Sequence, residues 1–486
     1  MRLYRELSSF IRSKVDEFLE FAVPIDAPIE NILVDSVETR RLIRAAGGLL
    51  YRNHNSDTEK AIKIIRWVLS RQFKNRFHLI TGNWKVSPDS DRLDSNWREF
   101  IGCELIIIYE NYHDRFSKNL NELIKLGLML AAENSKIRNV SPYYTNIATM
   151  SAFLMEYVGR TFKTYSLARL GLQKAYQIFK LYFKNQTFSE FNSPTYTGVT
   201  CIGLNLWRKY GSLKLQKLGE ILEAELWLQT AKFYNANLKN LAGPYIRGYG
   251  MNMLCYSSII GLWMLYILDD QNFAPYPTKK DNKYFEISNI VPIVHLDPHV
   301  PNSAIKEFTQ FSNERFLEGK IQKGNEFFTS RMDFHVMISS KWMMGGLRRD
   351  LRNWNQRKIG TIHWKDENSN SIGWILIPGN GKTDVVVTKT HMTVFSKRFL
   401  STIHIFVQGK DLKEHMFTKG RWILPGISFD VFSHKSSISI IPVTDLENFR
   451  ERWAIGDIVD SIMEISLKFP RRLRKQQVIT LEPLTE

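Results

Sequence analysis

The chain has 486 residues, more than the ~250–300 at which one hydrophobic core stops growing, so the sequence predicts two domains. Hydrophobic residues make up 44% of it and aromatic residues 13%, which excludes large-scale disorder. A formal net charge of +17 favours polyanions near the surface, whether nucleic acid, anionic lipid or acidic polysaccharide, without selecting one of them. The densest basic clusters, within residues 348–358 and 471–475, are predicted as solvated surface.

The cysteines, the N-terminus and the longest apolar stretch further restrict the class of protein. Cys103, Cys201 and Cys255 lie far apart, which excludes a disulfide framework and a cysteine-rich zinc site. No secretory signal is visible, and the longest apolar stretch, Leu254 to Leu268, is too short to predict a membrane span. We expect a soluble protein, cytoplasmic as the sequence stands, or secreted if the N-terminus is incomplete.

The first half of the chain has the pattern of successive helices. From Asp57 onwards, apolar side chains recur on one face at the 3.6-residue period, and a second helix opens near Asn96. Further helices are predicted over Leu120–Ala132, Ile147–Val158, Leu167–Leu181, Leu213–Trp227 and Met251–Leu268. Their apolar stripes are broad rather than heptad-like, which favours a globular helical array over a coiled coil.

The pattern changes near Asp269, where a polar and proline-bearing linker runs to Lys283. After a mixed or helical connection over Ser303–Arg331, β-branched and aromatic runs predict strands over Gly373–Ile377, Val385–Thr390, Thr402–Val407, Arg421–Leu424, Phe429–Phe432 and Ser436–Val443. Strands at this spacing favour an antiparallel sandwich. We therefore predict an α + β multidomain protein, with a helical domain over residues 1–275 and an antiparallel β-sandwich domain over residues 276–486.

Two predicted helices open with polar side chains. Asn96 and Trp97 begin one of them, and an indole beside an amide can hold a sugar ring by stacking and hydrogen bonding. Asn146 lies at the start of the helix predicted over Ile147–Val158. Helix capping and core packing are the plain alternatives for all three residues.

The stretch Phe188–Gly198 carries more polar chemistry than a helix connection needs. Glu190 can act as a general acid or base, and Asn192 can hydrogen-bond a substrate carboxylate. Tyr196 can exchange a proton if a neighbouring cation lowers its pKa. The alternative is a turn with local side-chain hydrogen bonds.

A glycine-rich loop, Gly243–Met251, groups Tyr245, Arg247 and Tyr249. Glycine allows the backbone to approach a ligand closely, and an arginine can bind a carboxylate and lower the pKa of a nearby tyrosine. A tight interhelical loop explains the glycines but not the grouping of two phenols around a guanidinium, so we predict a functional loop.

Histidines in the second half are weaker candidates. His295, Asp297 and His299 alternate like metal ligands on a strand, but the loop-like composition favours a chance arrangement, and we predict no metal and no cofactor. His335 and His363 stand in aromatic, strand-like contexts. Either can reach a cleft in the helical domain, and packing is the alternative reading.

The order of these motifs resembles the α/α-toroid polysaccharide lyases, including the heparinase II/III-like and hyaluronate/chondroitin lyase groups. The motifs are an Asn-Trp-x-x-x-Ile-Gly helix opening, an x-Thr-Asn helix opening, an acidic-x-x-Ser-x-x-Tyr loop, a glycine-rich tyrosine loop and a β-sandwich. The resemblance spans most of residues 57–440. It implies an incomplete toroid of helical hairpins, a sandwich packed against it, and β-elimination at a uronic acid.

The resemblance also implies roles for individual residues. Asn146 would neutralise the substrate carboxylate, and Tyr196 or Tyr249 would transfer the proton. Arg247 would be the cationic neighbour and Trp97 a sugar platform.

The sequence departs from this pattern in one respect. Hyaluronate-type enzymes carry a histidine just before the tyrosine loop, where this chain has Phe191-Asn192. Either a tyrosine serves as both base and acid, or a sandwich histidine such as His335 or His363 contributes, or the activity differs.

The leading hypothesis is a polysaccharide lyase acting on an acidic polysaccharide, with Asn96, Trp97, Asn192, Tyr245 and His363 binding substrate. A glycoside hydrolase that uses Glu190 with a second carboxylate, Glu99 or Asp94, is the first alternative. A non-catalytic polyanion-binding protein, for nucleic acid among others, is the second.

Overall fold

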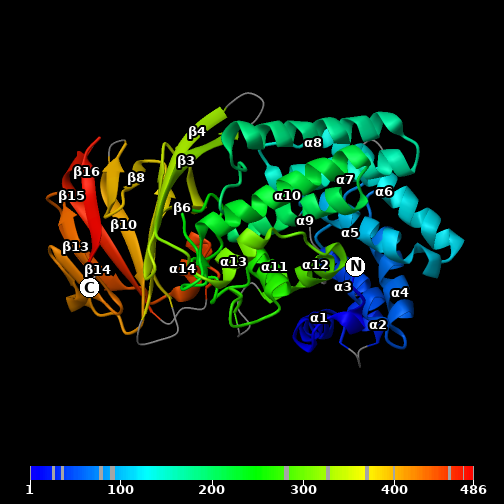
Figure 1. Cartoon of the computed structure of the whole chain (residues 1–486), viewed down its shortest axis with the longest axis horizontal. Coiled ribbons are helices and arrows are strands. Elements are labelled where there is room, and N and C mark those ends of the chain that lie inside the picture. Colours follow the sequence, from blue (N-terminus) through cyan, green and yellow to red (C-terminus); the bar gives the residue numbers. More distant parts are fainter. Residues whose placement is uncertain are drawn as a thin grey trace.

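The computed structural model describes residues 2–24, 28–33, 38–75, 80–87, 93–277, 284–324, 329–366, 372–397, 400–457, 461–473 and 475–484. Helices and strands occupy opposite ends of its long axis (Figure 1). The helices are α1 (Ser9–Ala22), α2 (Ile29–Ile32), α3 (Thr39–Arg52), α4 (Asp57–Ser70), α5 (Trp97–Tyr112), α6 (Lys118–Arg138), α7 (Thr145–Thr161), α8 (Tyr165–Asn185), α9 (Pro194–Tyr210), α10 (Leu213–Phe233), α11 (Ile259–Leu268), α12 (Ile290–Leu296), α13 (Asn302–Thr309) and α14 (Leu446–Trp453).

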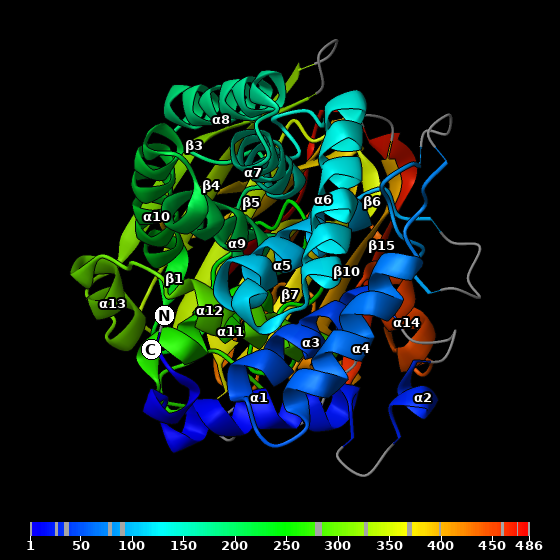
Figure 2. The same cartoon turned by 90° about the vertical axis from the view of Figure 1, so that its right-hand side faces the viewer.

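The helical part is an incomplete α/α toroid built from hairpins. Each of the pairs α3–α4, α5–α6, α7–α8 and α9–α10 packs together, and the inner helices α3, α5, α7, α9 and α11 contact one another in that order (Figure 2). The layers differ in their burial patterns. Helix α7 is buried at every position from Thr145 to Gly159, whereas α8 buries a single face at helical spacing.

The strands follow from β3 onwards. They are β3 (Arg315–Gly324), β4 (Thr329–Ile338), β5 (Trp342–Arg348), β6 (Asn353–Lys365), β7 (Ile372–Asn380), β8 (Thr383–Val387), β9 (Met392–Ser396), β10 (Leu400–Gln408), β11 (Phe417–Thr418), β12 (Arg421–Leu424), β13 (Ile427–Ser433), β14 (Ser437–Pro442), β15 (Ile462–Leu473) and β16 (Gln477–Leu484). A separate two-stranded hairpin, β1 (Tyr234–Asn235) and β2 (Asn240–Leu241), follows α10.

Within the described residues, one sheet has the order β14-β15-β10-β7-β6-β5-β4-β3 and the other has the order β11-β12-β13-β16-β9-β8. Neighbouring strands are antiparallel, and β5 packs on β8 across the two layers. Apolar side chains such as Trp374, Val385 and Met392 are buried in this part of the chain. The predicted α + β class, with helices first and antiparallel sheets after them, is confirmed.

Two predicted ranges are partly wrong. The helix predicted over Met251–Leu268 begins only at Ile259, because Ser258 caps it there and the amide of Met251 donates to Asp457 instead. The range Ser303–Arg331 contains α13, as expected, but also strand β3 and the start of β4. Strand β3 lies at the edge of its sheet, and among its described side chains only Ile321 is buried, so its apolar signal is weak. The domain division at residue 275 stays a prediction: α12 follows it in the chain but packs on α3, α9 and α11. Residues 278–283 of the predicted linker lie outside the described residues.

The loop after β2 is laid against the large sheet. Tyr245 and Lys358 of β6 exchange backbone hydrogen bonds of 3.0 and 3.1 Å, and the amide of Gly248 donates to the carbonyl of Gln356 at 2.8 Å. The approach requires glycine at position 345 in β5, because a Cβ there would lie 1.9 Å from the carbonyl oxygen of Gly243. The sheet therefore sets the position of the tyrosine loop.

The prediction that the basic cluster at 348–358 is solvated is wrong for two of its members. Arg357 is 1% exposed, lies 3.4 Å from Asp350 and donates to the carbonyl of Ile246. Lys358 is fully buried and donates to the carbonyls of Asn355 and Trp453. Both residues belong to the junction between loop and sheet rather than to a surface. The side chains of Arg471, Arg472 and Arg474 in the other cluster lie outside the description.

Among the described residues, no helix combines the length and the hydropathy needed to cross a bilayer.

Candidate active site

A cavity of about 480 Å³ lies where the inner helices α5, α7 and α9 begin. We call it the tyrosine cavity. Its lining consists of Glu38, Arg40, Val86, Asp94, Asn96, Trp97, Phe100, Tyr144, Asn146, Ile147, Thr195, Tyr196, Val199, Arg247, Tyr249, Ile259, Glu286 and Asn289. Unpaired backbone N–H groups at helix starts favour negative charge, so this wall suits an anionic group.

The start of α9 and the tyrosine loop are joined by one hydroxyl. The backbone amide of Tyr196 donates to Ser193 Oγ at 3.1 Å, which caps the helix. The same hydroxyl donates to the carbonyl of Arg247. The side chains of Tyr196 and Arg247 are therefore fixed relative to each other through their backbones.

A continuous chain of hydrogen bonds runs along the cavity. Arg247 Nη1 donates to Glu190 Oε1 at 2.8 Å, and its Nη2 donates to the Tyr196 hydroxyl at 2.6 Å. The hydroxyls of Tyr196 and Tyr249 are 2.8 Å apart. Gln356 closes the chain, because its Nε2 donates to the Tyr249 hydroxyl at 3.0 Å and its Oε1 accepts from Arg247 Nε at 3.1 Å.

Arg247 is also stacked on the tyrosine that it hydrogen-bonds. Its guanidinium carbon lies 3.5 Å from the centre of the Tyr196 ring and 5.3 Å from that of Trp354. Burial lowers the pKa of Arg247, but Glu190 and Tyr196 raise it by more, so the group stays charged.

Burial raises the pKa of Tyr196 well above its ordinary value, against the lowering effect of Arg247. Tyr249 and Glu190 raise it further. The sequence predicts a cation that lowers this pKa. The cation is present, but burial outweighs it, and the Tyr196 phenol is protonated at neutral pH.

Asn146 lines the tyrosine cavity and does not cap its helix. Helix α7 begins at Thr145 with Tyr144 at the cap position, and the backbone amide of Asn146 donates to Glu190 Oε2 at 2.8 Å. Its side-chain Nδ2 donates to the same oxygen, while its Oδ1 is buried with no hydrogen-bond partner among the described residues. Asn146 and Arg247 thus hold the two oxygens of Glu190 from opposite sides.

Asn96 likewise makes no capping hydrogen bond. Its Nδ2 donates to the Tyr144 hydroxyl at 3.1 Å, and its Oδ1 accepts from Arg138 at 2.6 Å. Trp97 borders the cavity but is only 4% exposed, and Arg40 lies 5.5 Å from its ring centre. Little of this indole is free to stack on a sugar.

Several predicted site residues lie away from the tyrosine cavity. Tyr245 is fully buried and donates its hydroxyl to the carbonyl of Leu241. His363 is fully buried, its Nε2 lies 2.9 Å from the carbonyl of Met251, and burial lowers its pKa to about 3. Asn192 has a left-handed backbone with φ of 49° and donates to the carbonyls of Ala242 and Pro244. These three side chains have packing and turn roles.

His335 lies on β4 beside a different depression of about 500 Å³, together with Lys184 and Arg349. The two carboxylates considered as partners of Glu190 in a hydrolase also lie in different places. Glu99 is fully buried and paired with Arg138 at 2.9 Å, whereas Asp94 lines the tyrosine cavity. The structure therefore brings together Asn146, Glu190, Tyr196, Arg247 and Tyr249, and leaves the sandwich histidines outside.

Gln356 is the residue that the sequence does not reveal. It stands beside Arg357 and Lys358 in a run that reads as basic surface. The pairing of β6 with the tyrosine loop brings it to Arg247, more than 100 positions earlier in the chain. No local pattern could have shown that approach.

The side chains of His295, Asp297 and His299, which alternate in sequence like metal ligands, do not form a common metal site. His295 is fully buried in α12, with Nδ1 at 2.7 Å from the carbonyl of Val291 and Nε2 at 2.7 Å from the Tyr112 hydroxyl. His299 faces Arg208 at 3.2 Å. In the part of the chain that the structure describes, no group of three or more His, Cys, Asp or Glu residues could hold a metal ion.

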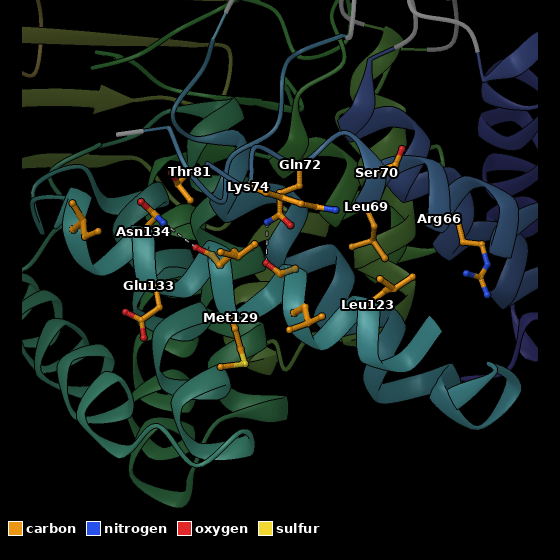
Figure 3. A pocket seen from close by; sticks show the side chains of 14 residues that line it. Arg66, Leu69, Ser70, Gln72, Lys74, Thr81, Leu123, Met129, Glu133 and Asn134 are labelled. Atoms are coloured by element: carbon orange, nitrogen blue, oxygen red, sulfur yellow. Dashed lines mark hydrogen bonds between the residues drawn. The ribbon is translucent and has the colours of Figure 1, made fainter. Parts of the chain in front are cut away.

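A second cavity, of about 650 Å³, lies between α4 and α6, and we call it the α4–α6 groove (Figure 3). Its floor is apolar, with Leu69, Leu123, Met129 and Leu130 among its side chains, and Lys74 reaches over it. None of the residues predicted from the sequence to form a site lines this groove.

A family model described as a domain of unknown function (DUF8769) matches residues 28–295, more than half of the chain. The chain belongs to this family. The match covers the toroid with Asn146, Glu190, Tyr196, Arg247 and Tyr249, and ends before the first strand of the large sheet. No curated protein matches the sequence.

Among solved structures, this member of the family is similar to the chondroitin AC lyase of Streptomyces coelicolor A3, determined in complex with chondroitin sulphate. The match covers 99% of this chain and 80% of that chain, with a TM-score of 0.50 and 8% identity. At this identity the likeness shows a polysaccharide lyase-like fold, and the chemistry has to be argued from the cavity itself.

Proposed function

We propose that the protein is a carbohydrate-active enzyme, a polysaccharide lyase that cleaves a uronic-acid glycan by β-elimination in the tyrosine cavity. One observation carries the proposal: two phenols share a 2.8 Å hydrogen bond, and each also accepts a hydrogen bond from a fixed donor, Arg247 or Gln356. The lyase-like fold supports it.

Substrate binding would use the wall formed by the helix starts. A uronate carboxylate placed against the first turns of α7 and α9 would meet the positive ends of the two helix dipoles and the second amide proton of Asn146. Hydrogen bonds that neutralise this carboxylate make the C5 proton of the same sugar more acidic. Electrostatic stabilisation of this kind is the largest contribution in many enzymes.

The tyrosine pair would then carry both proton transfers. One tyrosine, in its phenolate form, removes the C5 proton, the bond between C4 and the leaving oxygen breaks, and a C4–C5 double bond forms while the other tyrosine gives its proton to the leaving oxygen. The proton ends on the leaving oxygen, so atoms and charge balance without water. Tyr196 is protonated at neutral pH and suits the donor role, and the short contact with Tyr249 allows the proton to pass between the two oxygens.

The hydrolase alternative with Glu190 is less well supported. Both oxygens of Glu190 already accept hydrogen bonds, from Arg247 and from Asn146, and its side chain is 2% exposed. A carboxylate in that position orients its neighbours more readily than it reaches a glycosidic oxygen.

The test is to incubate the protein with uronic-acid polymers and to follow the ultraviolet absorbance of the unsaturated sugar. We expect absorbance with at least one polymer, and a rate lower by about a thousandfold for Tyr196→Phe or Tyr249→Phe variants that remain folded. Release of reducing ends without that absorbance would overturn the lyase and indicate hydrolysis.

A further inference from the structure

The two walls of the tyrosine cavity differ in charge. The helix starts, Asn146 and Arg247 form one wall, but the charge of Arg247 is already compensated by Glu190 at 2.8 Å. The rest of the lining includes three partly exposed carboxylates, Glu38, Asp94 and Glu286. In the described part of the chain, none of these three forms a salt bridge.

Apart from Arg247, one cation belongs to the described residues of the lining, Arg40. Arg40 lies 5.5 Å from the ring centre of Trp97 and 5.0 Å from that of Phe100, and this stacking keeps it along the aromatic side of the cavity. Counting Arg247 with Glu190 as neutral, the remaining described residues of the lining include three negative groups and one positive group. The described lining is therefore net acidic, although Arg41 acts on Glu38 and Arg44 on Glu286 from outside it, and the whole chain carries a net charge of +17.

Existing hydrogen bonds leave these carboxylates with acceptor capacity. Asp94 Oδ1 accepts from the backbone amide of Asn96 at 2.9 Å, and Glu286 Oε2 accepts from Asn289 Nδ2 at 2.8 Å. A carboxylate has about four acceptor positions, so each of the two keeps free ones. Sugar hydroxyls can donate to them, whereas a sulfate ester has only acceptors.

We propose that the tyrosine cavity selects a uronic-acid glycan that carries no sulfate on the sugar bound against Glu38, Asp94 and Glu286. This inference rests on the proposed function and narrows its substrate class. A sulfate at that position would add a permanent negative charge beside three carboxylates in a partly enclosed space, where charges interact more strongly than in water. Such like-charge contacts are a common means of rejecting a wrong ligand.

The overall charge does not oppose this selection. A net positive field attracts sulfated and unsulfated polyanions alike over distances up to about 8 Å at physiological salt. Discrimination arises only once the sugar is inside the cavity. We therefore expect salt to weaken the binding of both ligands and to leave their order unchanged.

The experiment measures binding to the intact Tyr196→Phe variant, which would bind with very little turnover. The probes are an unsulfated chondroitin octasaccharide and its 4-sulfated and 6-sulfated forms, titrated calorimetrically. We expect the unsulfated form to bind at least about tenfold more tightly, the effect of one or two like charges at close range. Equal or tighter binding of the sulfated forms would overturn the inference.

Two double variants, each removing two negative charges, test whether the preference for the unsulfated ligand arises in the cavity. In the same background, Glu38→Gln with Glu286→Gln removes two charges from the cavity, and the preference should fall to about twofold or less. Glu20→Gln with Glu220→Gln removes two charges from exposed positions outside the cavity and should leave the preference unchanged. An equal change in both double variants would overturn the inference.

The design separates this inference from the proposed function. If no uronic-acid octasaccharide binds and no polymer yields an unsaturated product, both are overturned. If the unsaturated product forms from sulfated and unsulfated polymers at the same rate, the lyase stands and the selectivity is overturned.

Discussion

The tyrosine cavity and the α4–α6 groove are both large enough to hold a ligand, and they differ in almost every other respect. The groove is larger, about 650 Å³ against 480 Å³, and has an apolar floor. The tyrosine cavity is lined by charged and phenolic side chains that hold one another at 2.6–3.1 Å. Size and apolar surface therefore point to one place, whereas preorganised polar groups point to the other. Proton transfer needs the second kind of place.

The groove and the tyrosine cavity also differ in the elements that contribute their linings. The groove is formed by two helices, α4 and α6, and the segment that follows α4. The tyrosine cavity draws on three helix starts, the tyrosine loop and, through Gln356, strand β6. A substitution in the groove should therefore have local effects, whereas one in the tyrosine cavity should affect several elements.

The largest effect is expected for Tyr196→Phe. Removal of this hydroxyl should lower kcat/KM by about a thousandfold, in the range measured for general acid–base groups. Substrate binding and the unfolding midpoint should change little, because the ring remains stacked against Arg247. The assay is the initial rate of ultraviolet absorbance, and Met129→Leu in the groove is the control. Equal rates for Tyr196→Phe and this control would remove the tyrosine pair from the mechanism.

Glu190→Ala should be the most destabilising change. It leaves the guanidinium of Arg247, whose side chain is 11% exposed, without a counter-ion, which costs about 3 kcal/mol of unfolding free energy. Glu190→Gln should cost less, since an amide oxygen can still accept from Arg247. Glu133→Ala, at an exposed position of the groove, is the matched control. Urea denaturation measures all three, and equal midpoints for Glu190→Ala and Glu133→Ala would contradict the expectation.

Lys358 makes the stability of the junction depend on pH. Burial lowers its pKa to about 7 in the folded protein, below the ~10.4 of an unfolded chain. Between these values the unfolded state binds more protons, so its contribution to stability rises with pH, by up to about 1.4 kcal/mol per pH unit. Lys358→Met should flatten this rise between pH 7 and pH 9, and Lys74→Met in the groove should not. Parallel pH curves for the two variants would show that Lys358 titrates normally.

Substitution of one glutamine in each region, Gln356 and Gln72, compares the tyrosine cavity with the groove directly. Gln356→Leu removes the acceptor for Arg247 and the donor to Tyr249, so kcat should fall by about tenfold with KM nearly unchanged. Gln72→Leu removes hydrogen bonds to the carbonyls of Gly82 and Gly127 beside the groove, so it should lower stability and leave the turnover of the folded enzyme intact. If both variants lowered kcat equally, the role of Gln356 would be structural.

The smallest effect is expected at Leu126, a groove residue that is 58% exposed. Leu126→Ala should change the unfolding free energy by less than about 0.5 kcal/mol, as is usual for surface substitutions. Turnover should remain that of the wild type. A clear loss of activity in the same ultraviolet assay would show that the groove is coupled to the chemistry.

The fold class and the order of helices before antiparallel strands could be predicted from the sequence because their signals are local. The helical period in α4 and the β-branched runs of β10 and β13 identify elements and their order, and both are confirmed. Strands β3 to β6, β9, β15 and β16 were not predicted. In edge strand β3 only Ile321 is buried among the described side chains, so its apolar signal is weak. The boundary between the two domains stays a prediction.

The candidate site could be predicted only in part. Polar residues at helix starts identify Asn146 and Tyr196, and the glycine-rich loop identifies Arg247 and Tyr249, which the structure brings into contact. The same loop offers Tyr245, and no local pattern shows which phenol turns inward. That choice is made by the pairing with Lys358 of β6, far away in the sequence. The catalytic roles of these residues remain predictions.

The pairing of the tyrosine loop with β6 has a consequence for work on fragments of this family. The segment that the family model recognises ends at residue 295, before the sheet on which Arg247 and Tyr249 are held. A fragment cut at that point would keep the inner helices and lose both the template of the loop and one end of the hydrogen-bond chain. The smallest piece able to reproduce the intact cavity extends at least through Lys365, the end of β6.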